Sequence, residues 1–172
     1  MNRKTRKLVR ALGPSSLSVL EISGTFWKDR EPFREYRSLG FSELDICARA
    51  PPGEYDLIIA EQVFEHLLYP HRAARNVRAA LRPGGHFLVT VPFLYRVHNE
   101  PVDCTRWTEL GLKHHLRDCG FPLETITTGS RGNRRAVKEN LPASVPYRPR
   151  LHSLKNEPPW PITVWALARN TD

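Results

Sequence analysis

The sequence predicts an α/β fold built around a mostly parallel central sheet. Two short apolar runs, residues 56–60 and 86–91, have the length and the Ile, Leu and Val content of strands buried on both faces. Between these runs, apolar residues recur at helical spacing on one face: Ala73, Ala74, Val77, Ala80 and Leu81. A strand, a helix and a strand in this order predict a parallel pair joined by a right-handed crossover.

The crossover helix has signals at both ends. Pro70 suits the first helical position, where its missing N–H costs nothing, and Pro83-Gly84-Gly85 predicts the stop and the turn into the next strand. Before this unit, residues 26–37 are expected to be irregular, with room for one short helix. A strand over residues 41–46 is then predicted to deliver Asp45 at its end.

The N-terminal part of the chain adds a helix and a strand. Residues 2–12 are predicted to form an amphipathic helix with Lys and Arg on its outer face. Residues 17–22 are predicted to form a strand that ends near Glu21. The Ser23-Gly24 pair follows as a tight turn.

A polar loop and a helix follow the second central strand. His98, Asp103, Arg106 and Thr108 belong to the pattern H-x-x-P-x-D-x-x-R-x-T. Thr108 is a good N-cap for the helix after it, and Gly120 ends that helix.

Two further strands are predicted over residues 123–128 and 162–169. Residues 129–161 between them are read as a long loop insertion, and loops of this length are usually functional or disordered. With 172 residues, the chain is predicted to form a single domain, 1–172, with one core.

Composition narrows the possible partners. The formal net charge is +8, but no DNA- or RNA-reading motif accompanies it, so the sequence does not favour nucleic acid as a partner. No apolar stretch approaches membrane-spanning length and no signal-peptide core follows the basic start, so we expect a soluble, cytoplasmic protein. The 3 cysteines have no C-x-x-C spacing, and no His, Cys or carboxylate cluster has metal-ligand spacing. The sequence therefore predicts neither disulfides nor a metal site, and it leaves the oligomeric state open.

Polar side chains follow both central strands at the end where parallel sheets bind ligands. Glu61, Gln62, Glu65 and His66 come after the first strand, and Arg96 follows the second. These side chains either bind a ligand or only cap elements and turn loops, and topology alone leaves both readings open.

Four segments share a pattern with one enzyme family. They are Tyr55-Asp56-Leu57-Ile58-Ile59, Val63-Phe64-Glu65-His66, Leu81-Arg82-Pro83-Gly84-Gly85 and Val91-Pro92. Together they resemble the class I S-adenosylmethionine-dependent methyltransferases of the small methyltransferase-domain type (types 11 and 23). The resemblance implies a Rossmann-like fold with helices on both faces and a C-terminal antiparallel hairpin. It also implies S-adenosylmethionine as cofactor, and the spacing suggests that one strand-and-helix unit is missing here.

The resemblance also assigns cofactor contacts. Glu21 and Gly24 match the first cofactor motif, in which glycines let the backbone approach the methionine moiety, and Ser23 stands at one of the motif's glycine positions. Only Gly24 remains of the two or three glycines that the family carries. Asp45 could bind the ribose hydroxyls or lie near the adenine, but not both, and Glu61 and Gln62 are expected beside the methionine end.

The chemistry predicted is methyl transfer to a small-molecule or sugar-like acceptor at oxygen, with nitrogen or carbon as the alternative acceptor atom. A hydroxyl acceptor benefits from a general base, and His98, with Asp103 orienting it, is the first candidate; His66 is the second. Arg106 and Arg96 are expected to bind an acidic group of the substrate. Arg106 could instead simply pair with Asp103.

Two other functions stay open. The reduced glycine loop is compatible with a degenerate cofactor-binding partner subunit that does not catalyse. The net charge is compatible with a basic nucleic-acid-binding module on the same fold. The Asn/Asp-Pro-Pro-Tyr/Phe motif of base-amine methyltransferases is missing after Ala60, which argues against methylation of a nucleobase amino group.

Overall fold

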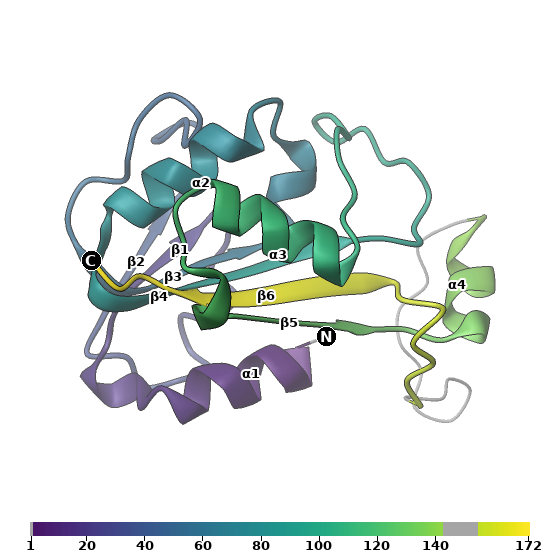
Figure 1. Ribbon diagram of the computed structural model, residues 1–172, viewed down its shortest axis with the longest axis horizontal. Coiled ribbons are helices and arrows are strands. Elements are labelled where there is room, and N and C mark those ends of the chain that lie inside the picture. Colours follow the sequence, from purple (N-terminus) through teal and green to yellow (C-terminus); the bar gives the residue numbers. More distant parts are fainter. Residues whose placement is uncertain (1, 143–154) are drawn as a thin grey trace.

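The computed structural model describes residues 2–142 and 155–172, and its strands form one 6-stranded sheet (Figure 1). The strands are β1 (Ser18–Ile22), β2 (Glu35–Leu39), β3 (Tyr55–Glu61), β4 (Leu81–Pro92), β5 (Ile126–Arg131) and β6 (Thr163–Arg169). Their order is β2-β1-β3-β4-β6-β5, with β1 to β4 parallel and β6 antiparallel to both β4 and β5. The predicted fold class, a mostly parallel sheet closed by an antiparallel hairpin, is confirmed.

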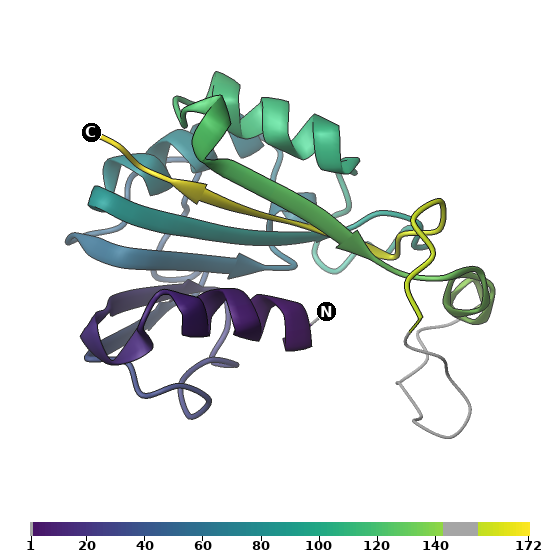
Figure 2. The same ribbon diagram turned by 60° about the horizontal axis from the view of Figure 1, so that its bottom comes forward.

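Helices cover both faces of the sheet, as the two views show (Figures 1 and 2). The helices over the faces are α1 (Asn2–Ala11), α2 (Pro70–Ala79) and α3 (Glu109–Asp118), whereas α4 (Arg134–Asn140) lies beyond the end of the β5–β6 hairpin. On one face, Val9 of α1 packs in a cluster with Val19 and Leu57 of the sheet. On the other face, α2 and α3 lie over the sheet and contribute to the larger core cluster. None of the helices in the described residues has the length and apolar content needed to cross a bilayer.

The second strand lies earlier in the chain than the sequence predicted. The predicted strand over residues 41–46 is wrong, because β2 is Glu35–Leu39 and pairs in parallel with β1 from Ser18↔Glu35 onward. Residues 41–46 form turns instead: the amides of Glu43 and Leu44 donate to the Gly40 carbonyl, and Leu44 is buried by this turn rather than by a strand. The short helix allowed for within residues 26–37 is replaced by a series of turns.

The hairpin at the end of the sheet begins later than predicted, because residues 123–125 form one turn of 3-10 helix before β5. The predicted insertion between the last two strands contains the end of β5 and all of α4. Residues 143–154 of that insertion lie outside the described residues, and the single-domain organisation stays a prediction.

The chain between β1 and β2 contains no helix, and one buried carboxylate organises it. Glu21, at 3% exposure, accepts hydrogen bonds from the amides of Phe26 (3.0 Å) and Trp27 (2.9 Å). It also accepts one from the hydroxyl of Tyr36 on β2 (2.6 Å). Trp27, fully buried, thereby joins the cluster beneath the sheet around Val9. This carboxylate therefore fixes both the turn after β1 and the strand next to it.

We expect Tyr36→Phe to lower the free energy of unfolding by about 1.5–3 kcal/mol, because it removes a hydrogen bond to a charged acceptor. Burial, and then the Glu21 carboxylate, raise the pKa of Tyr36. Since the unfolded chain then loses its phenol proton first, this contribution is complete below about pH 10 and is lost as the pH rises further. Urea titrations from pH 7 to 11 measure both effects.

The matched control is Tyr69→Phe, whose ring is 47% exposed. It should leave the neutral-pH stability and the alkaline slope of the wild type unchanged. Equal alkaline slopes for wild type and Tyr36→Phe would contradict the assigned role of this hydroxyl.

Candidate active site

Two strained residues mark the carboxyl edge of the parallel strands. Ser23 follows β1 with φ 56°, and Gln62 follows the neighbouring strand β3 with φ 57°. Non-glycine residues in this left-handed region cost of order 1–3 kcal/mol and cluster at functional sites. Both residues are exposed, and Gln62 is held by its amide to the Thr90 carbonyl (2.9 Å) and by its side chain to the Thr90 hydroxyl (3.0 Å). The strain therefore lies at one open edge of the sheet.

The turn after β1 brings together three residues that the sequence assigned to a cofactor. A Cβ on Gly24 would lie 2.6 Å from Glu21 Oε1, so a side chain fits here only if the Glu21 carboxylate moves. Ser38 on β2 donates its hydroxyl to the Gly24 carbonyl. The Glu21 carboxylate points into the turn and accepts hydrogen bonds from the loop amides, so it stabilises the turn.

Glu61 and Asp45 differ in their surroundings. Glu61 Oε2 accepts from the indole of Trp27 (3.3 Å), whereas its Oε1 is buried without a hydrogen-bond partner. Burial raises the pKa of the Glu61 carboxyl, against the opposing hydrogen bonds from Thr5 and Trp27. Asp45 is exposed in the turn after β2, where its Oδ1 accepts from the amide of Cys47 (2.9 Å). The prediction that Asp45 ends a strand is therefore wrong. Asp45 lies in the turn after β2, on the side of the sheet where β2 ends.

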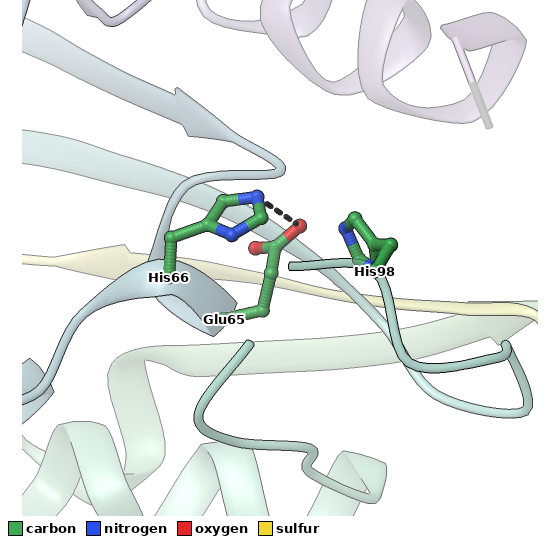
Figure 3. A group of neighbouring side chains, drawn as sticks. All are labelled: Glu65, His66 and His98. Atoms are coloured by element: carbon green, nitrogen blue, oxygen red, sulfur yellow. Dashed lines mark ion pairs between the residues drawn. The ribbon is translucent and has the colours of Figure 1, made fainter. Parts of the chain in front are cut away.

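A second group lies beyond β3 and β4, around a single turn of 3-10 helix, Phe64–His66 (Figure 3). Glu65 is fully buried, and neither of its carboxylate oxygens has a hydrogen-bond partner. His66 Nε2 lies 3.7 Å from Glu65 Oε1, and the rings of His66 and His98 meet edge to face with centroids 5.1 Å apart. Burial raises the pKa of the Glu65 carboxyl, and the nearby His66 opposes that rise.

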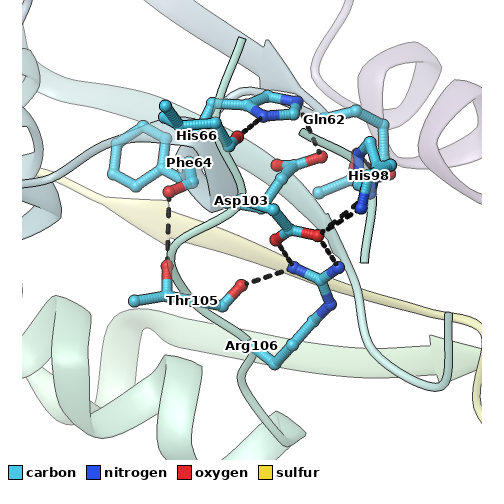
Figure 4. A network of polar contacts seen from close by, with 10 residues as sticks. Gln62, Phe64, His66, His98, Asp103, Thr105 and Arg106 are labelled. Carbon is cyan, nitrogen blue, oxygen red and sulfur yellow. Dashed lines mark hydrogen bonds and ion pairs between the residues drawn. The ribbon is translucent and has the colours of Figure 1, made fainter. Parts of the chain in front are cut away.

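Asp103 fixes the loop that carries His98 (Figure 4). Its Oδ2 accepts from the His98 amide (2.9 Å) and lies 3.2 Å from His98 Nδ1, out of line for a hydrogen bond to the ring. Both terminal nitrogens of Arg106 donate to the same carboxylate. These hydrogen bonds from Arg106 lower the pKa of Asp103 to about 2, so the carboxylate that holds this loop is ionised at neutral pH.

The same loop is clamped onto the turn of 3-10 helix. His66 Nδ1 makes a hydrogen bond with the Val102 carbonyl, and the Glu65 carbonyl accepts from the amide of Cys104 (2.7 Å). The structure thus brings together four of the candidate residues, His66, His98, Asp103 and Arg106, and leaves Arg96 exposed on the neighbouring stretch.

Glu65 was expected at this edge from the sequence but was given no catalytic or binding role there. The available signal was a carboxylate directly after the apolar pair Val63-Phe64, in a segment whose pattern predicts burial. One carboxylate and two imidazoles at this point can exchange protons with a bound acceptor or coordinate a cation.

Comparison with known proteins points to one family. A family model described as "Methyltransferase domain" matches residues 31–128. A polyketide synthase-nonribosomal peptide synthetase, phmA of Phaeosphaeria nodorum, is 33% identical over 94 residues, covering 49% of this chain and 2% of the synthetase. The chain thus spans about 2% of the length of the curated relatives that it matches.

Solved structures share the fold. An S-adenosylmethionine-dependent methyltransferase from Mesorhizobium loti is 15% identical, with a TM-score of 0.60 over 95% of this chain and 96% of that one. A methyltransferase in complex with the Haloferax volcanii Trm112 methyltransferase activator is also 15% identical, with a TM-score of 0.59 over 98% and 89% of the two chains. At this level of identity the likeness establishes the architecture.

The turn after β1 yields a stability prediction. Gly24→Ala should lower the free energy of unfolding by about 1–3 kcal/mol, because the added Cβ must displace the Glu21 carboxylate from its loop amides. Gly40→Ala, in the turn after β2, is the matched control, since its Cβ would meet Glu43 Oε2 at an ordinary 3.7 Å. Chemical denaturation of both variants tests this, and equal stabilities would contradict a tight turn at Gly24.

Proposed function

The chain belongs to the family of S-adenosylmethionine-dependent methyltransferase domains, and we propose that it methylates an oxygen of a small-molecule or sugar-like acceptor. The observation that carries the proposal is the group formed by Glu65, His66 and His98 beyond β3 and β4. This group lies at the same carboxyl edge of the sheet as the strained residues Ser23 and Gln62. A cofactor bound at Ser23 and Gln62 would therefore meet an acceptor bound beside the group.

The residues of the first turn and of the end of β3 suit the cofactor. Ser23 and Gly24 form a tight turn in which Gly24 carries no side chain that would keep a cofactor from the backbone. Gln62 is exposed after the neighbouring strand β3. The unpaired buried oxygen of Glu61 suits a positively charged partner such as an ammonium or a sulfonium. Glu21 acts through the turn that it holds, and Asp45 is proposed as a contact to the ribose or the adenine. When bound, S-adenosylmethionine supplies a methyl group whose C–S bond breaks toward sulfur as the acceptor oxygen takes the carbon.

The loop after β4 would prepare the acceptor. His98 is the proposed proton acceptor for the hydroxyl, and Asp103 positions it through the backbone amide. His66, held by the Val102 carbonyl, borders the same point and is the second candidate. Because both terminal nitrogens of Arg106 are engaged by Asp103, Arg106 acts as a positioning residue in this proposal. Arg96, being exposed, is the proposed contact for an acidic group of the acceptor.

A cofactor-binding partner subunit is the second candidate function. It is favoured by the turn after β1, where one glycine remains and the carboxylate of Glu21 is occupied internally. A complex with a methyltransferase activator is known for a protein of the same fold, which makes a protein partner a reasonable search target. Turnover by the isolated chain with any hydroxyl acceptor separates the two functions.

We expect isothermal titration calorimetry to detect S-adenosylmethionine binding, and Asp45→Ala to weaken it about tenfold through loss of a charge-assisted hydrogen bond. Asp118→Ala is the control, since this exposed carboxylate ends α3 and is paired with its own neighbour Arg117. No heat of binding at millimolar cofactor would end the enzymatic proposal, and unchanged affinity in Asp45→Ala would remove only the role of Asp45.

His98→Ala should lower turnover by roughly a hundredfold or more while leaving the cofactor dissociation constant unchanged, since the side chain acts on the acceptor. His114→Ala on α3 is the matched control and should retain normal turnover. A screen of hydroxylated acceptors followed by single-turnover assays measures the effect. Near-normal turnover in His98→Ala would transfer the role to His66, which the equivalent variant then tests.

A further inference from the structure

We propose that Glu65, His66 and His98 form a binding site for one divalent transition-metal ion. One potential ligand atom from each of these side chains lies within 4.8 Å of the other two. This inference deepens the proposed function, because it assigns to the same three side chains a way of activating the acceptor. The binding event itself does not depend on methyl transfer and is measured separately.

The spacing of the ligand atoms suits an ion. Transition-metal ions bind imidazole nitrogen and carboxylate oxygen at about 2.0–2.2 Å, so two ligands of one tetrahedral ion lie roughly 3.4 Å apart. His66 Nε2 and Glu65 Oε1 are 3.7 Å apart, close to that value. A small inward movement of the half-buried His98 ring completes the set. Figure 3 shows the three side chains converging on one point from the 3-10 turn and from the loop after β4.

Glu65 lacks the partner that a buried carboxylate requires. It is fully buried, and both of its oxygens are without a hydrogen-bond partner. Leaving a buried polar group unsatisfied costs several kcal/mol, and a charged group costs more. Arg106, the nearest guanidinium in this network, is already bound in a bidentate pair by Asp103. A dication between Glu65 and the imidazoles would supply the missing positive charge.

The imidazole of His66 is already oriented as metal-ligating histidines usually are. The Val102 carbonyl can only accept, so His66 Nδ1 carries the proton and Nε2 is left with a free lone pair toward Glu65. Asp103 accepts from the backbone amide of His98 and lies beside its ring without a hydrogen bond to it. An outer partner of the kind that His66 has, a backbone carbonyl, fixes ring orientation at metal sites.

The ligand set indicates which ions fit. Two imidazole nitrogens and one carboxylate suit Zn²⁺, Mn²⁺, Co²⁺ or Fe²⁺, whereas Mg²⁺ and Ca²⁺ prefer oxygen ligands throughout. Three protein ligands leave coordination positions open. An acceptor hydroxyl bound there would have its pKa lowered by the ion, so that His98 would serve as a ligand and the ion would replace it as the activating group.

The test is a titration of the metal-free protein with Co²⁺, followed by its visible absorption and by thermal unfolding. The wild type should bind one ion and unfold at a higher temperature with Co²⁺. Glu65→Gln and His66→Ala should weaken binding by about a hundredfold or more, while His114→Ala keeps the wild-type affinity. Mg²⁺ at the same concentration should shift the unfolding temperature much less than Co²⁺.

Glu65→Gln also guards against misfolding as an explanation. This isosteric change removes an unpaired buried charge, so the metal-free variant should be at least as stable as the metal-free wild type. Equal Co²⁺ responses of wild type, Glu65→Gln and His66→Ala, or a wild type that binds no ion, would overturn the proposal.

Turnover with and without EDTA keeps the two proposals apart. If the protein binds no Co²⁺ and transfers methyl groups at the full rate in EDTA, the proposed function holds and the metal site is refuted. Stoichiometric Co²⁺ binding that is lost in Glu65→Gln, without any methyl transfer, supports the metal site and counts against the proposed function.

Discussion

The carboxylate of Glu21 is the constraint on which the N-terminal half of the structure depends. Without a helix between β1 and β2, the backbone amides of that stretch need another acceptor, and Glu21 supplies it for Phe26 and Trp27. The indole of Trp27 is thereby buried against the α1 side of the sheet and reaches Glu61 at the end of β3. One buried acid thus links β1 to β2 through Tyr36 and, through Trp27, to the carboxyl end of β3 beside the candidate site.

Hydrophobic periodicity predicted the helices and strands that bury a regularly spaced set of apolar residues. In the β3–α2–β4 unit, apolar residues stand at strand or helix spacing in β3, in α2 and over residues 86–91, so the existence and direction of the unit could be read from the sequence. The sequence prediction for the start of β4 is wrong, because it assigns Leu81 to the helix and Pro83-Gly84-Gly85 to a turn, whereas all of them belong to the strand Leu81–Pro92. β2 could not be read from the sequence, because it is an edge strand whose residues alternate between exposed and half-buried until Leu39. An edge strand needs few apolar residues, whereas Leu44 and Ile46, which resembled a strand, are buried by a turn.

The candidate site was predictable as far as topology determines it. His66 and His98 follow neighbouring parallel strands, so their proximity could be expected from the sheet alone. Their grouping with Glu65 could not, since it depends on the loop carrying His98 folding back onto the 3-10 turn through Val102 and Cys104. A search for metal ligands by spacing along the chain misses such a set, because its third member comes from a different loop.

The charges around Glu65, His66 and His98 show how the Glu65 carboxylate differs from that of Asp103. Asp103 is neutralised by Arg106, and this pair holds the loop without contributing net charge at the site. Glu65 remains as a buried carboxylate with unpaired oxygens, and Glu61, at the end of β3 just before the 3-10 turn of Glu65, has one more unpaired oxygen. Such groups lower stability unless a positive partner joins them. Together with the strained backbone at Ser23 and Gln62, they add unfavourable energy at this edge of the sheet. That edge is therefore suited to positively charged ligands, and a sulfonium cofactor and a metal cation both meet this requirement.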